Sequence, residues 1–263
     1  MSARRAGCAA FAAAWLWAFA GGAFAATLQI SPVTIEFSAS ENATGLTLRN
    51  PGDTPLYGQV RVFHWAQADG DDVLTPTADV IASPPLIEIA PHGDQLVRLV
   101  RVNAAGTANV ANAASGASAP ASADNANAEL SYRLLIDELP APGTANADGV
   151  TIRLRYSVPV FVEPRGGMAP PLLTWRLVHG AHGYALRADN AGQRRAQISA
   201  VQLFDDSGHS WDVTHGLLGY ALGHQGRQWN VPVPPDAKIG RMKVRATVNT
   251  QPVEDAVAIE QGG

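Results

Sequence analysis

Residues 150–160 read Val-Thr-Ile-Arg-Leu-Arg-Tyr-Ser-Val-Pro-Val, with an apolar side chain at nearly every second position. The apolar positions are Val150, Ile152, Leu154, Tyr156, Val158 and Val160. Successive side chains of a β-strand point to opposite faces, so this alternation predicts an amphipathic strand about 35 Å long. Because Pro159 has no N–H to donate, the strand should lie at a sheet edge, or be interrupted, on the side that Pro159 faces.

A long edge strand with an apolar face ordinarily promotes aggregation. Two interpretations fit the pattern. The strand can be an ordinary core-facing strand, or it can be offered to another protein, in which case backbone hydrogen bonds supply affinity and alternate side chains fill pockets. The alternation by itself leaves both interpretations open.

The rest of the chain repeats this period of two. Short runs rich in Val, Ile, Leu, Thr and Tyr alternate with Gly, Pro, Asn and Asp clusters, which is typical of an all-β protein. Strands are expected first at 27–37, 44–49, 57–65, 86–89, 95–102, 132–138 and 150–162, and this spacing predicts a two-sheet sandwich of immunoglobulin type. After a Pro- and Gly-rich linker at 163–171, further strands are expected at 172–178, 184–189, 197–204, 210–213, 228–233, 243–248 and 256–260.

The chain begins with the pattern of a secretory signal. Arg4 and Arg5 precede an apolar run at 8–20 that is too short to span a bilayer, and Ala23-Phe24-Ala25 supplies the small residues of a cleavage site. We therefore expect a signal peptide at 1–25, an N-terminal immunoglobulin-like domain at 26–164 and a C-terminal β-sandwich at 165–263. An Ala-, Asn- and Ser-rich segment at 104–128 is expected to form a disordered surface loop.

Composition excludes several classes of function. The 263 residues carry a formal net charge of -4, which argues against a nucleic-acid partner because phosphate binding needs a clustered cationic face. The one cysteine, Cys8, lies in the expected signal peptide, so no disulfide or thiol chemistry is expected in the mature chain. After the signal, no continuous apolar stretch reaches the length of a membrane-spanning helix, so no membrane insertion is expected.

Motifs of catalysis and cofactor binding are not found in the sequence. His179 and His182 flank a Gly-Ala pair without a Cys or carboxylate at ligand spacing, and Asp205-Asp206 is typical of a hairpin turn. We therefore expect no catalytic, cofactor-binding or metal-binding residue. Four tryptophans of the mature chain are interpreted as core rather than as a sugar-stacking platform: Trp65, Trp175, Trp211 and Trp229.

A series of short motifs runs through the mature chain. They are Ser31-Pro32-Val33, DDVLTPT at 71–77, Ser83-Pro84-Pro85, PHGDQLVR at 91–98, SYRL at 131–134, ELP at 138–140 and LRYSVPVFVEP at 154–164. In their order and spacing the chain resembles the periplasmic pilus-assembly chaperones, and more narrowly the archaic branch associated with spore-coat-U-type subunits. The resemblance is more specific in the first domain than in the second.

The resemblance implies two immunoglobulin-like domains in a boomerang arrangement and a non-enzymatic role in fimbrium biogenesis and cell-wall organisation. It implies a periplasmic chaperone that completes pilin subunits by donor-strand complementation and delivers them to an outer-membrane usher. The donor residues would be Val150, Ile152, Leu154 and Tyr156, and no cofactor is implied. Whether the chaperone self-associates in the absence of a subunit is left open.

One position departs from the better-known chaperones, which hold the C-terminal carboxylate of the pilin with an arginine in the first strand and a lysine in the donor strand. Thr34 and Pro159 occupy those positions here, and neither carries a charge. Arginines can bind a carboxylate through charge-assisted hydrogen bonds. The candidate anchors are therefore Arg133 first, followed by Arg98 and Arg101.

A second class of function remains open at this point. A secreted two-domain adhesin or carbohydrate-binding module would use the tryptophans and tyrosines as stacking surfaces. The alternation at 150–160 and the Ser83-Pro84-Pro85 segment favour the chaperone.

Overall fold

The computed structural model describes residues 28–102, 128–143, 152–164, 166–180, 183–234, 237 and 239–261. Every regular element in these ranges is a β-strand, which confirms the all-β prediction. No helix long and apolar enough to cross a membrane occurs among them. The expected signal peptide, Val150 and all of the expected loop at 104–128 except Ala128 lie outside the described residues, and Ala128 is buried.

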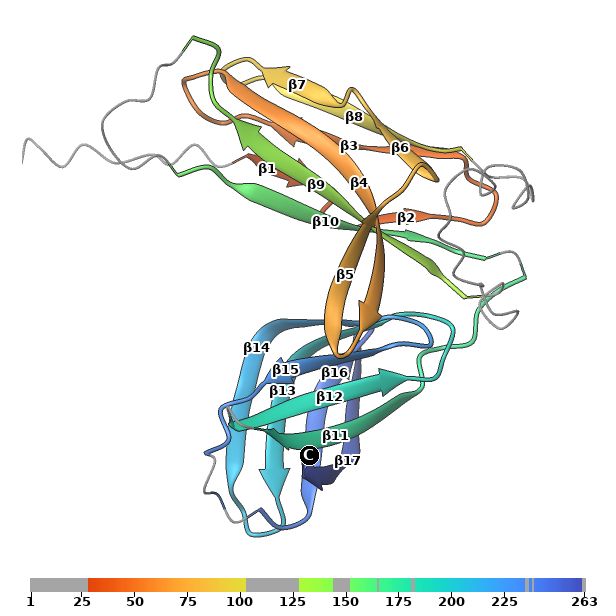
Figure 1. Cartoon of the computed structure of the whole chain (residues 1–263), viewed down its shortest axis with the longest axis vertical. Coiled ribbons are helices and arrows are strands. Elements are labelled where there is room, and N and C mark those ends of the chain that lie inside the picture. Colours follow the sequence, from red (N-terminus) through yellow and green to blue (C-terminus); the bar gives the residue numbers. More distant parts are fainter. Residues whose placement is uncertain are drawn as a thin grey trace, which may run out of the picture.

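The first half of the chain forms two sheets packed face to face (Figure 1). The four-stranded sheet has the order β1 (Gln29–Ser31), β3 (Ala43–Arg49), β8 (Asp94–Arg101) and β6 (Val80–Ser83). The six-stranded sheet has the order β2 (Ile35–Phe37), β10 (Arg155–Val162), β9 (Leu130–Leu139), β4 (Leu56–Ala68) and β5 (Asp71–Pro76), and β7 (Leu86–Ile89) also pairs with β4.

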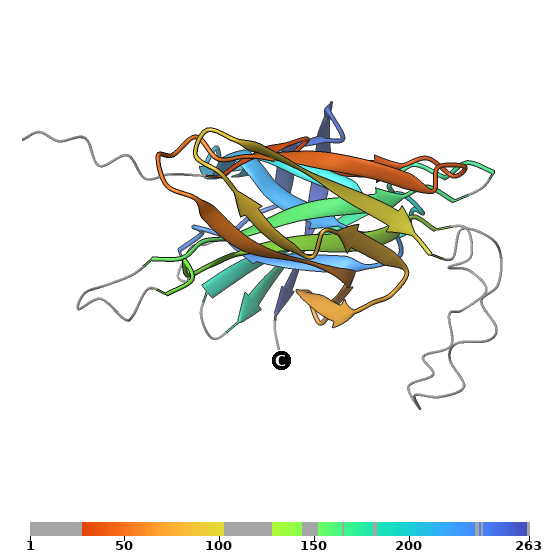
Figure 2. The ribbon, with the colours of Figure 1, turned by 90° about the horizontal axis from the view of Figure 1, so that it is seen from above.

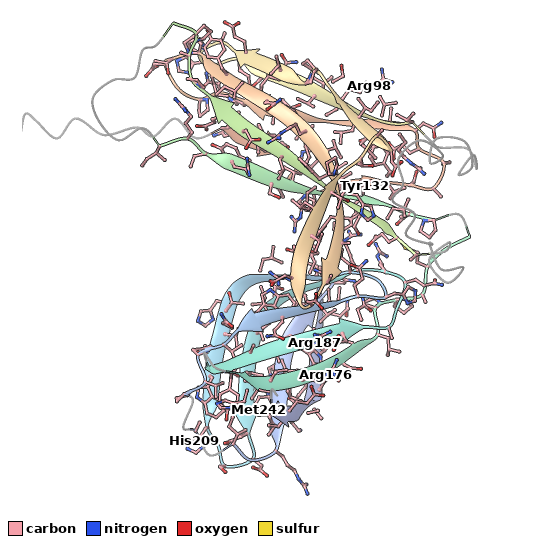
Figure 3. The ribbon with its side chains drawn as sticks, viewed as in Figure 1. Arg98, Tyr132, Arg176, Arg187, His209 and Met242 are labelled. Atoms are coloured by element: carbon pink, nitrogen blue, oxygen red, sulfur yellow. The ribbon has the colours of Figure 1, made fainter. Side chains whose placement is uncertain are left out.

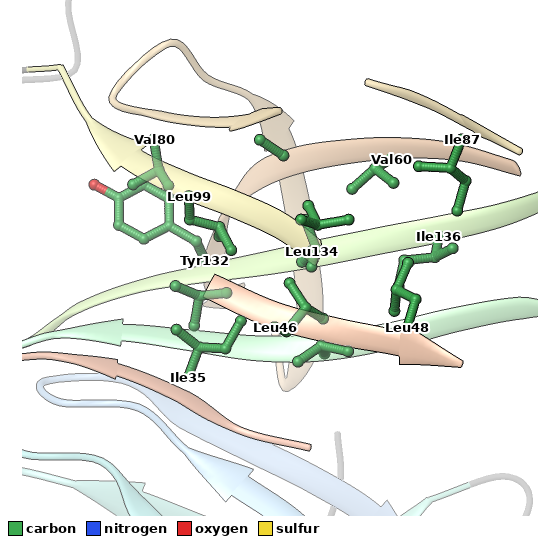
Figure 4. Close-up of a cluster of buried hydrophobic side chains, with 14 of the residues drawn as sticks. Ile35, Leu46, Leu48, Val60, Val80, Ile87, Leu99, Tyr132, Leu134 and Ile136 are labelled. Carbon is green, nitrogen blue, oxygen red and sulfur yellow. The ribbon is translucent and has the colours of Figure 1, made fainter. Parts of the chain in front are cut away.

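Alternate side chains of both sheets fill the space between them. Figure 4 shows Leu46 and Leu48 of β3 lying against Leu134 and Ile136 of β9, and each of these four side chains is at most 1% exposed. The intervening residues of each strand face outward, as the period of two requires. The core of the first half therefore depends on apolar alternation alone, without a disulfide.

Two strands predicted for the first half differ clearly from the observed ones, and in the second half the strand predicted at 210–213 extends to Ala221. The strand expected at 27–37 is divided, because the chain leaves the four-stranded sheet after β1 and joins the six-stranded sheet at β2. The strand expected at 150–162 begins only at Arg155, so the predicted length was wrong. Strands β5 and β6 were not expected. All six residues of β5 are exposed and carry no apolar alternation, and β6 is only four residues long.

The second half is built on one seven-stranded sheet. Its order is β14 (Ser210–Ala221), β13 (Ala196–Asp205), β16 (Met242–Val248), β17 (Gln251–Gln261), β11 (Leu173–Gly180), β12 (Gly183–Asn190) and β15 (Gly226–Asn230). Strand β14 also contacts β12 and β15, so the sheet curls around its own core. That core includes the fully buried Trp175, Leu177 and Ile198.

The two halves meet at the hairpin of β4 and β5. Figure 1 shows this hairpin reaching the second half, and Figure 2 shows the same two halves from above. Gly70 at the hairpin tip has a positive φ of 83° and accepts a hydrogen bond from the Gln228 backbone N–H at 3.0 Å. The Gln67 side-chain amide donates to the Tyr220 carbonyl at 2.8 Å and accepts from the Leu222 N–H at 3.0 Å. These contacts hold the two halves at an angle to each other.

The core of the first half gives a direct test of the packing. We predict that Leu134→Ala lowers the free energy of unfolding by about 2–5 kcal/mol, because Leu134 is fully buried and its truncation leaves a cavity. Leu96→Ala is the matched control, since Leu96 is 62% exposed on β8 and its loss should change stability little. Urea unfolding of both variants makes the comparison, and equal destabilisation would contradict the assigned core.

Candidate functional site

One edge of strand β10 is open over half of its length. Strand β9 pairs with the whole of β10, from Arg155 opposite Asp137 to Val162 opposite Leu130. Strand β2 pairs only with Val160–Val162, in parallel. Among the described residues, therefore, no strand lies beside β10 from Arg155 to Pro159 on the β2 side.

The pairing with β2 also shows which side of β10 the nitrogen of Pro159 faces. Glu163 donates its N–H to the Phe37 carbonyl of β2 at 3.0 Å, and alternate residues of a strand direct their N–H groups the same way. The nitrogen of Pro159 consequently faces the β2 side, directly before the ladder with β2 begins at Val160. The predicted interruption at Pro159 is confirmed, because pairing on that side stops there.

The apolar row of this strand leaves the core as it runs toward residue 152. Val158, Val160 and Val162 are buried between the two sheets, and Tyr156 is half-buried against the same core. Leu154 is 41% exposed and Ile152 is 79% exposed. One continuous apolar face thus begins inside the sandwich and ends in solvent.

Tyr156 marks the boundary between these two parts. Its hydroxyl donates to the Glu138 carboxylate at 3.0 Å and accepts from the Leu28 N–H at 3.1 Å. Burial, together with the hydrogen bond to Glu138, raises the pKa of Tyr156 to about 12. The hydroxyl is therefore protonated, and able to donate, at every physiological pH.

The opposite face of β9 and β10 carries a cluster of charges. Arg61 of β4 and Arg155 of β10 both donate to the carboxylate of Asp137, with Arg61 Nη2 at 2.6 Å. Burial alone would raise the pKa of Asp137, but the hydrogen bonds from Arg155 and Arg61 outweigh it and hold that pKa below its usual range. The cluster keeps a net positive charge, because two guanidinium groups share one carboxylate.

Arg133, the first candidate anchor, lies on the same face of β9. Its guanidinium carbon is 3.6 Å from the centre of the Trp65 ring and 5.7 Å from that of Tyr220. Burial lowers the pKa of Arg133 from its usual value, although a guanidinium stays charged in proteins. Arg133 is thus a positive group stacked on an aromatic ring where the two halves meet.

The other two candidate anchors lie elsewhere. Arg98 alternates with the buried Val97 and Leu99 of β8, so it points away from the sandwich core and away from the second half (Figure 3). Arg101 donates to the backbone carbonyl of Glu41 at 3.1 Å. The structure does not bring the three arginines together, and the role of each as an anchor stays a prediction.

Sequence analysis missed the contacts that join the two halves. The guanidinium of Arg195 lies 3.7 Å from the centre of the Phe161 ring and forms ion pairs with Glu129 and Glu36. Burial raises the pKa of Glu129 despite the charge of Arg195 beside it. Phe161 also packs with three further residues from both halves: Trp65, Tyr220 and Leu222. These residues are far apart in sequence, so no local pattern connects them.

The structure shows where the tryptophans and the acidic residues considered for other functions lie. Trp175 is 1% exposed, and Trp211 and Trp229 pack partly buried against the second core, which confirms their interpretation as core residues. Trp65 is also 1% exposed, but it lies in the cluster where the two halves meet and not in a sandwich core. The Asp205 carboxylate accepts from the N–H groups of Ser207 and His209 at 2.9 Å, as expected of a turn. In the described part of the chain, no group of three or more His, Cys, Asp or Glu side chains is placed to hold a metal ion.

The structure thus combines two immunoglobulin-like domains set at an angle with an apolar strand row that runs out of the first one. Residues 27–167 match the family described as pili and flagellar-assembly chaperones, through its PapD N-terminal domain. The chain belongs to this family of chaperones.

Solved structures support the fold over both halves. The chain is 24% identical to the chaperone in the CsuC–CsuE chaperone–tip adhesion subunit complex from archaic Csu pili of Acinetobacter baumannii, with a TM-score of 0.59 over 90% of this chain and 100% of that one. The CupB2 chaperone of Pseudomonas aeruginosa is 17% identical, with a TM-score of 0.53 over 88% of this chain and 100% of that one. The match from the Salmonella enterica complex of SafA pilin with the SafB chaperone is 15% identical, with a TM-score of 0.54 over 88% and 96% of the two chains. No curated protein matches the chain.

The Asp137 cluster makes the stability of the protein depend on pH. Because the folded-state pKa of Asp137 lies below the ordinary value of 3.8, its ionised form stabilises the fold above about pH 4. This contribution is lost as the pH falls through the lowered pKa. We predict that Asp137→Asn reduces the free energy of unfolding by about 1–3 kcal/mol at pH 7, and that the difference shrinks below pH 4.

Urea unfolding of the wild type and the variant between pH 7 and pH 2.5 measures this difference. A difference that stays constant, or grows, as the solution is acidified would contradict the assigned ion pairs.

Proposed function

We propose that this protein is a periplasmic chaperone of the archaic type, which holds pilus subunits by donor-strand complementation and passes them to an outer-membrane usher. The observation that carries the proposal is the apolar row of β10, which continues from the buried Val158 to the exposed Leu154 and Ile152 beside an open strand edge. Membership of the chaperone family and the likeness to chaperones solved with their pilus subunits support it.

Burial of the exposed row supplies the affinity. Complete burial of one Val, Leu or Ile side chain contributes roughly 1.5–3 kcal/mol, so Val150, Ile152 and Leu154 together supply at most about 5–9 kcal/mol before the costs of association. The share of Leu154 is smaller, because it is only 41% exposed before binding. A pilin that lacks one strand exposes an apolar groove of the matching kind. The chaperone side chains would fill that groove and keep the subunit from aggregating.

The open backbone edge supplies direction and register. The N–H groups of Arg155 and Ser157 face the same side as the nitrogen of Pro159, where no strand lies beside them in the described ranges. A subunit strand added there would extend the six-stranded sheet, with main-chain hydrogen bonds providing affinity and the row of side chains providing specificity.

Arg133 is the proposed anchor for the C-terminal carboxylate of the subunit. It lies on the strand next to β10, carries a permanent charge and is held against Trp65. A guanidinium that is already held in place loses little side-chain entropy when it binds a carboxylate. Arg98 lies on the other sheet and faces away from β10, which makes Arg133 the better candidate.

The remaining properties follow from this role. Pilin subunits and an outer-membrane usher are the proposed partners, and the periplasm is the proposed location, in agreement with the expected signal peptide at 1–25. The proposed activity is binding without catalysis and needs no cofactor. The adhesin alternative receives no support, because the tryptophans it would use pack into the second core or, for Trp65, into the cluster where the two halves meet.

The donor row is tested by placing a charge on it. We predict that Ile152→Asp or Leu154→Asp abolishes capture of the pilin encoded beside the chaperone gene, because an unpaired charge would enter the apolar groove of the subunit. Both side chains are exposed in the free chaperone, so the thermal midpoint should change little. The measurement is the amount of complex recovered after co-expression, with thermal melting of each variant alone.

Arg153→Asp is the matched control, since Arg153 is exposed and projects to the opposite face of the same segment. It should retain most of the captured pilin. If the Ile152 and Leu154 variants captured the pilin as well as the wild type, residues 150–154 would not be the donor segment.

The anchor is tested by removing its charge. We predict that Arg133→Gln weakens capture by about tenfold or more, because a charge-assisted hydrogen bond to the subunit carboxylate is lost. A pilin extended by two residues at its C-terminus should be captured weakly by the wild type and no more weakly by the variant. Arg98→Gln serves as the control and should capture the unmodified pilin normally.

Competition between tagged wild-type and variant chaperones for limiting pilin gives these ratios. Normal capture by Arg133→Gln together with weak capture by Arg98→Gln would identify Arg98, and not Arg133, as the anchor.

A further inference from the structure

The exposed end of the apolar row is held by one carboxylate. Residues 152–154 precede the first residue of β10, yet Leu154 lies opposite Glu138 at the end of β9. The backbone N–H of Glu138 donates to the Leu154 carbonyl at 3.0 Å. The Leu154 N–H donates to the Glu138 carboxylate at 3.3 Å, where regular pairing would use a backbone carbonyl. The Glu138 side chain therefore replaces the last rung of the ladder.

The same carboxylate receives the hydroxyl of Tyr156. Its Oε1 accepts from the Tyr156 hydroxyl at 3.0 Å, while its Oε2 accepts from Leu154. The Tyr156 hydroxyl in turn accepts from the Leu28 N–H at 3.1 Å, and Leu28 is 4% exposed within the core of the sandwich. A chain of three hydrogen bonds therefore connects Leu28, directly before β1, to Leu154 at the end of the proposed donor segment.

Both the ring and the hydroxyl of Tyr156 already have partners within the chaperone. Its ring packs half-buried against the sandwich core, and its hydroxyl both donates and accepts a hydrogen bond. Inserting this side chain into a subunit groove would break both hydrogen bonds and leave Glu138 and the Leu28 N–H without these partners. Leu154 and Ile152 carry no such commitment, because their side chains are already exposed.

We propose that Glu138 and Tyr156 are positioning residues that hold the donor segment against β9, so that the row of side chains offered to a subunit ends at Leu154 and does not include Tyr156. This rests on the donor-strand function proposed above. It assigns to Tyr156 a role different from donation, and it gives Glu138 of the motif at 138–140 a positioning role that the motif alone does not indicate. The consequence is a fixed register: Ile152 and Leu154 enter the groove, and Tyr156 marks its limit.

A variant that lacks the Tyr156 hydroxyl distinguishes insertion of Tyr156 into the subunit groove from positioning of the donor segment. If Tyr156 entered an apolar groove, Tyr156→Phe would keep the ring, lose a polar atom, and capture pilin as well as the wild type or better. If it positions the segment, the same variant should capture about tenfold less pilin, because the hydrogen-bonded connection to Glu138 is lost. Glu138→Ala should show a similar loss, and the double variant should lose no more than the larger single loss.

The chain supplies a matched control pair. Tyr57 of β4 donates its hydroxyl to the Glu88 carboxylate of β7 at 3.1 Å, between residues directly opposite each other. This pair has the same chemistry as Tyr156 and Glu138 but lies away from β10. Tyr57→Phe and Glu88→Ala should leave capture unchanged.

The experiment mixes differently tagged wild-type and variant chaperones with limiting pilin from the neighbouring gene, and measures the bound ratio. Amide hydrogen exchange of the free chaperones supplies a readout that does not depend on pilin. Exchange at Leu154 should rise about tenfold in Tyr156→Phe and Glu138→Ala, while exchange in the core strand β9 at Leu134 stays as in the wild type. A rise confined to Leu154 and its neighbours excludes general unfolding as the cause of lost capture.

The outcomes are distinct. Wild-type capture by Tyr156→Phe, with Ile152→Asp inactive, would overturn the positioning role and leave donor-strand binding intact. Unchanged exchange at Leu154 in both variants would also overturn it. Wild-type capture by Ile152→Asp would instead overturn the donor-strand function itself, whatever the result at Tyr156.

Discussion

The arrangement depends on one apolar face that the chain cannot bury completely. Strand β10 places Val158, Val160 and Val162 between its two sheets, and this part of the row is as buried as any other core strand. Beyond Tyr156 the same face continues past the end of the sandwich core, so Leu154 and Ile152 remain exposed. Exposed apolar side chains beside an unpaired backbone edge are unfavourable for a lone protein and favourable for a partner that needs a strand. The strand is thereby both a structural element of the chaperone and its proposed binding surface.

The opposite face of the same sheet carries charged side chains that connect its strands and that reach the second half. Arg61, Arg155 and Asp137 tie β4, β9 and β10 together, and Arg133 stacks on Trp65 where the two halves meet. The hairpin of β4 and β5 reaches the second half through Gln67 and Gly70. The sheet that presents the exposed apolar row is therefore also the sheet that holds the second half.

The sequence predicts part of this account from local patterns alone. The alternation at 150–160 identifies the row, and the missing N–H of Pro159 correctly predicts where pairing on one side stops. Local patterns do not reveal that the strand begins only at Arg155, because alternation continues unchanged into the segment that has left the sandwich. Strand β5 was not predicted because both of its faces are exposed. The division into β1 and β2 was not predicted because a change of sheet keeps the period of two. Arg195 and Gln67 act through partners brought near only by folding, so nothing in their immediate sequence marks them. The motif at 138–140 contains Glu138 but does not indicate its hydrogen bonds to Leu154 and Tyr156.

The central claim is that a subunit adds a strand to the open edge of β10, and the backbone amides of that edge report it most directly. Arg155 and Ser157 direct their N–H groups toward the open side, whereas Tyr156 and Val158 direct theirs toward β9. Residue-resolved hydrogen exchange should therefore show Arg155 and Ser157 exchanging rapidly in the free chaperone and strongly protected in the complex with pilin, with little change at Val158. If Arg155 and Ser157 exchanged equally fast with pilin bound, the subunit would be held at another surface and the donor-strand account would be wrong.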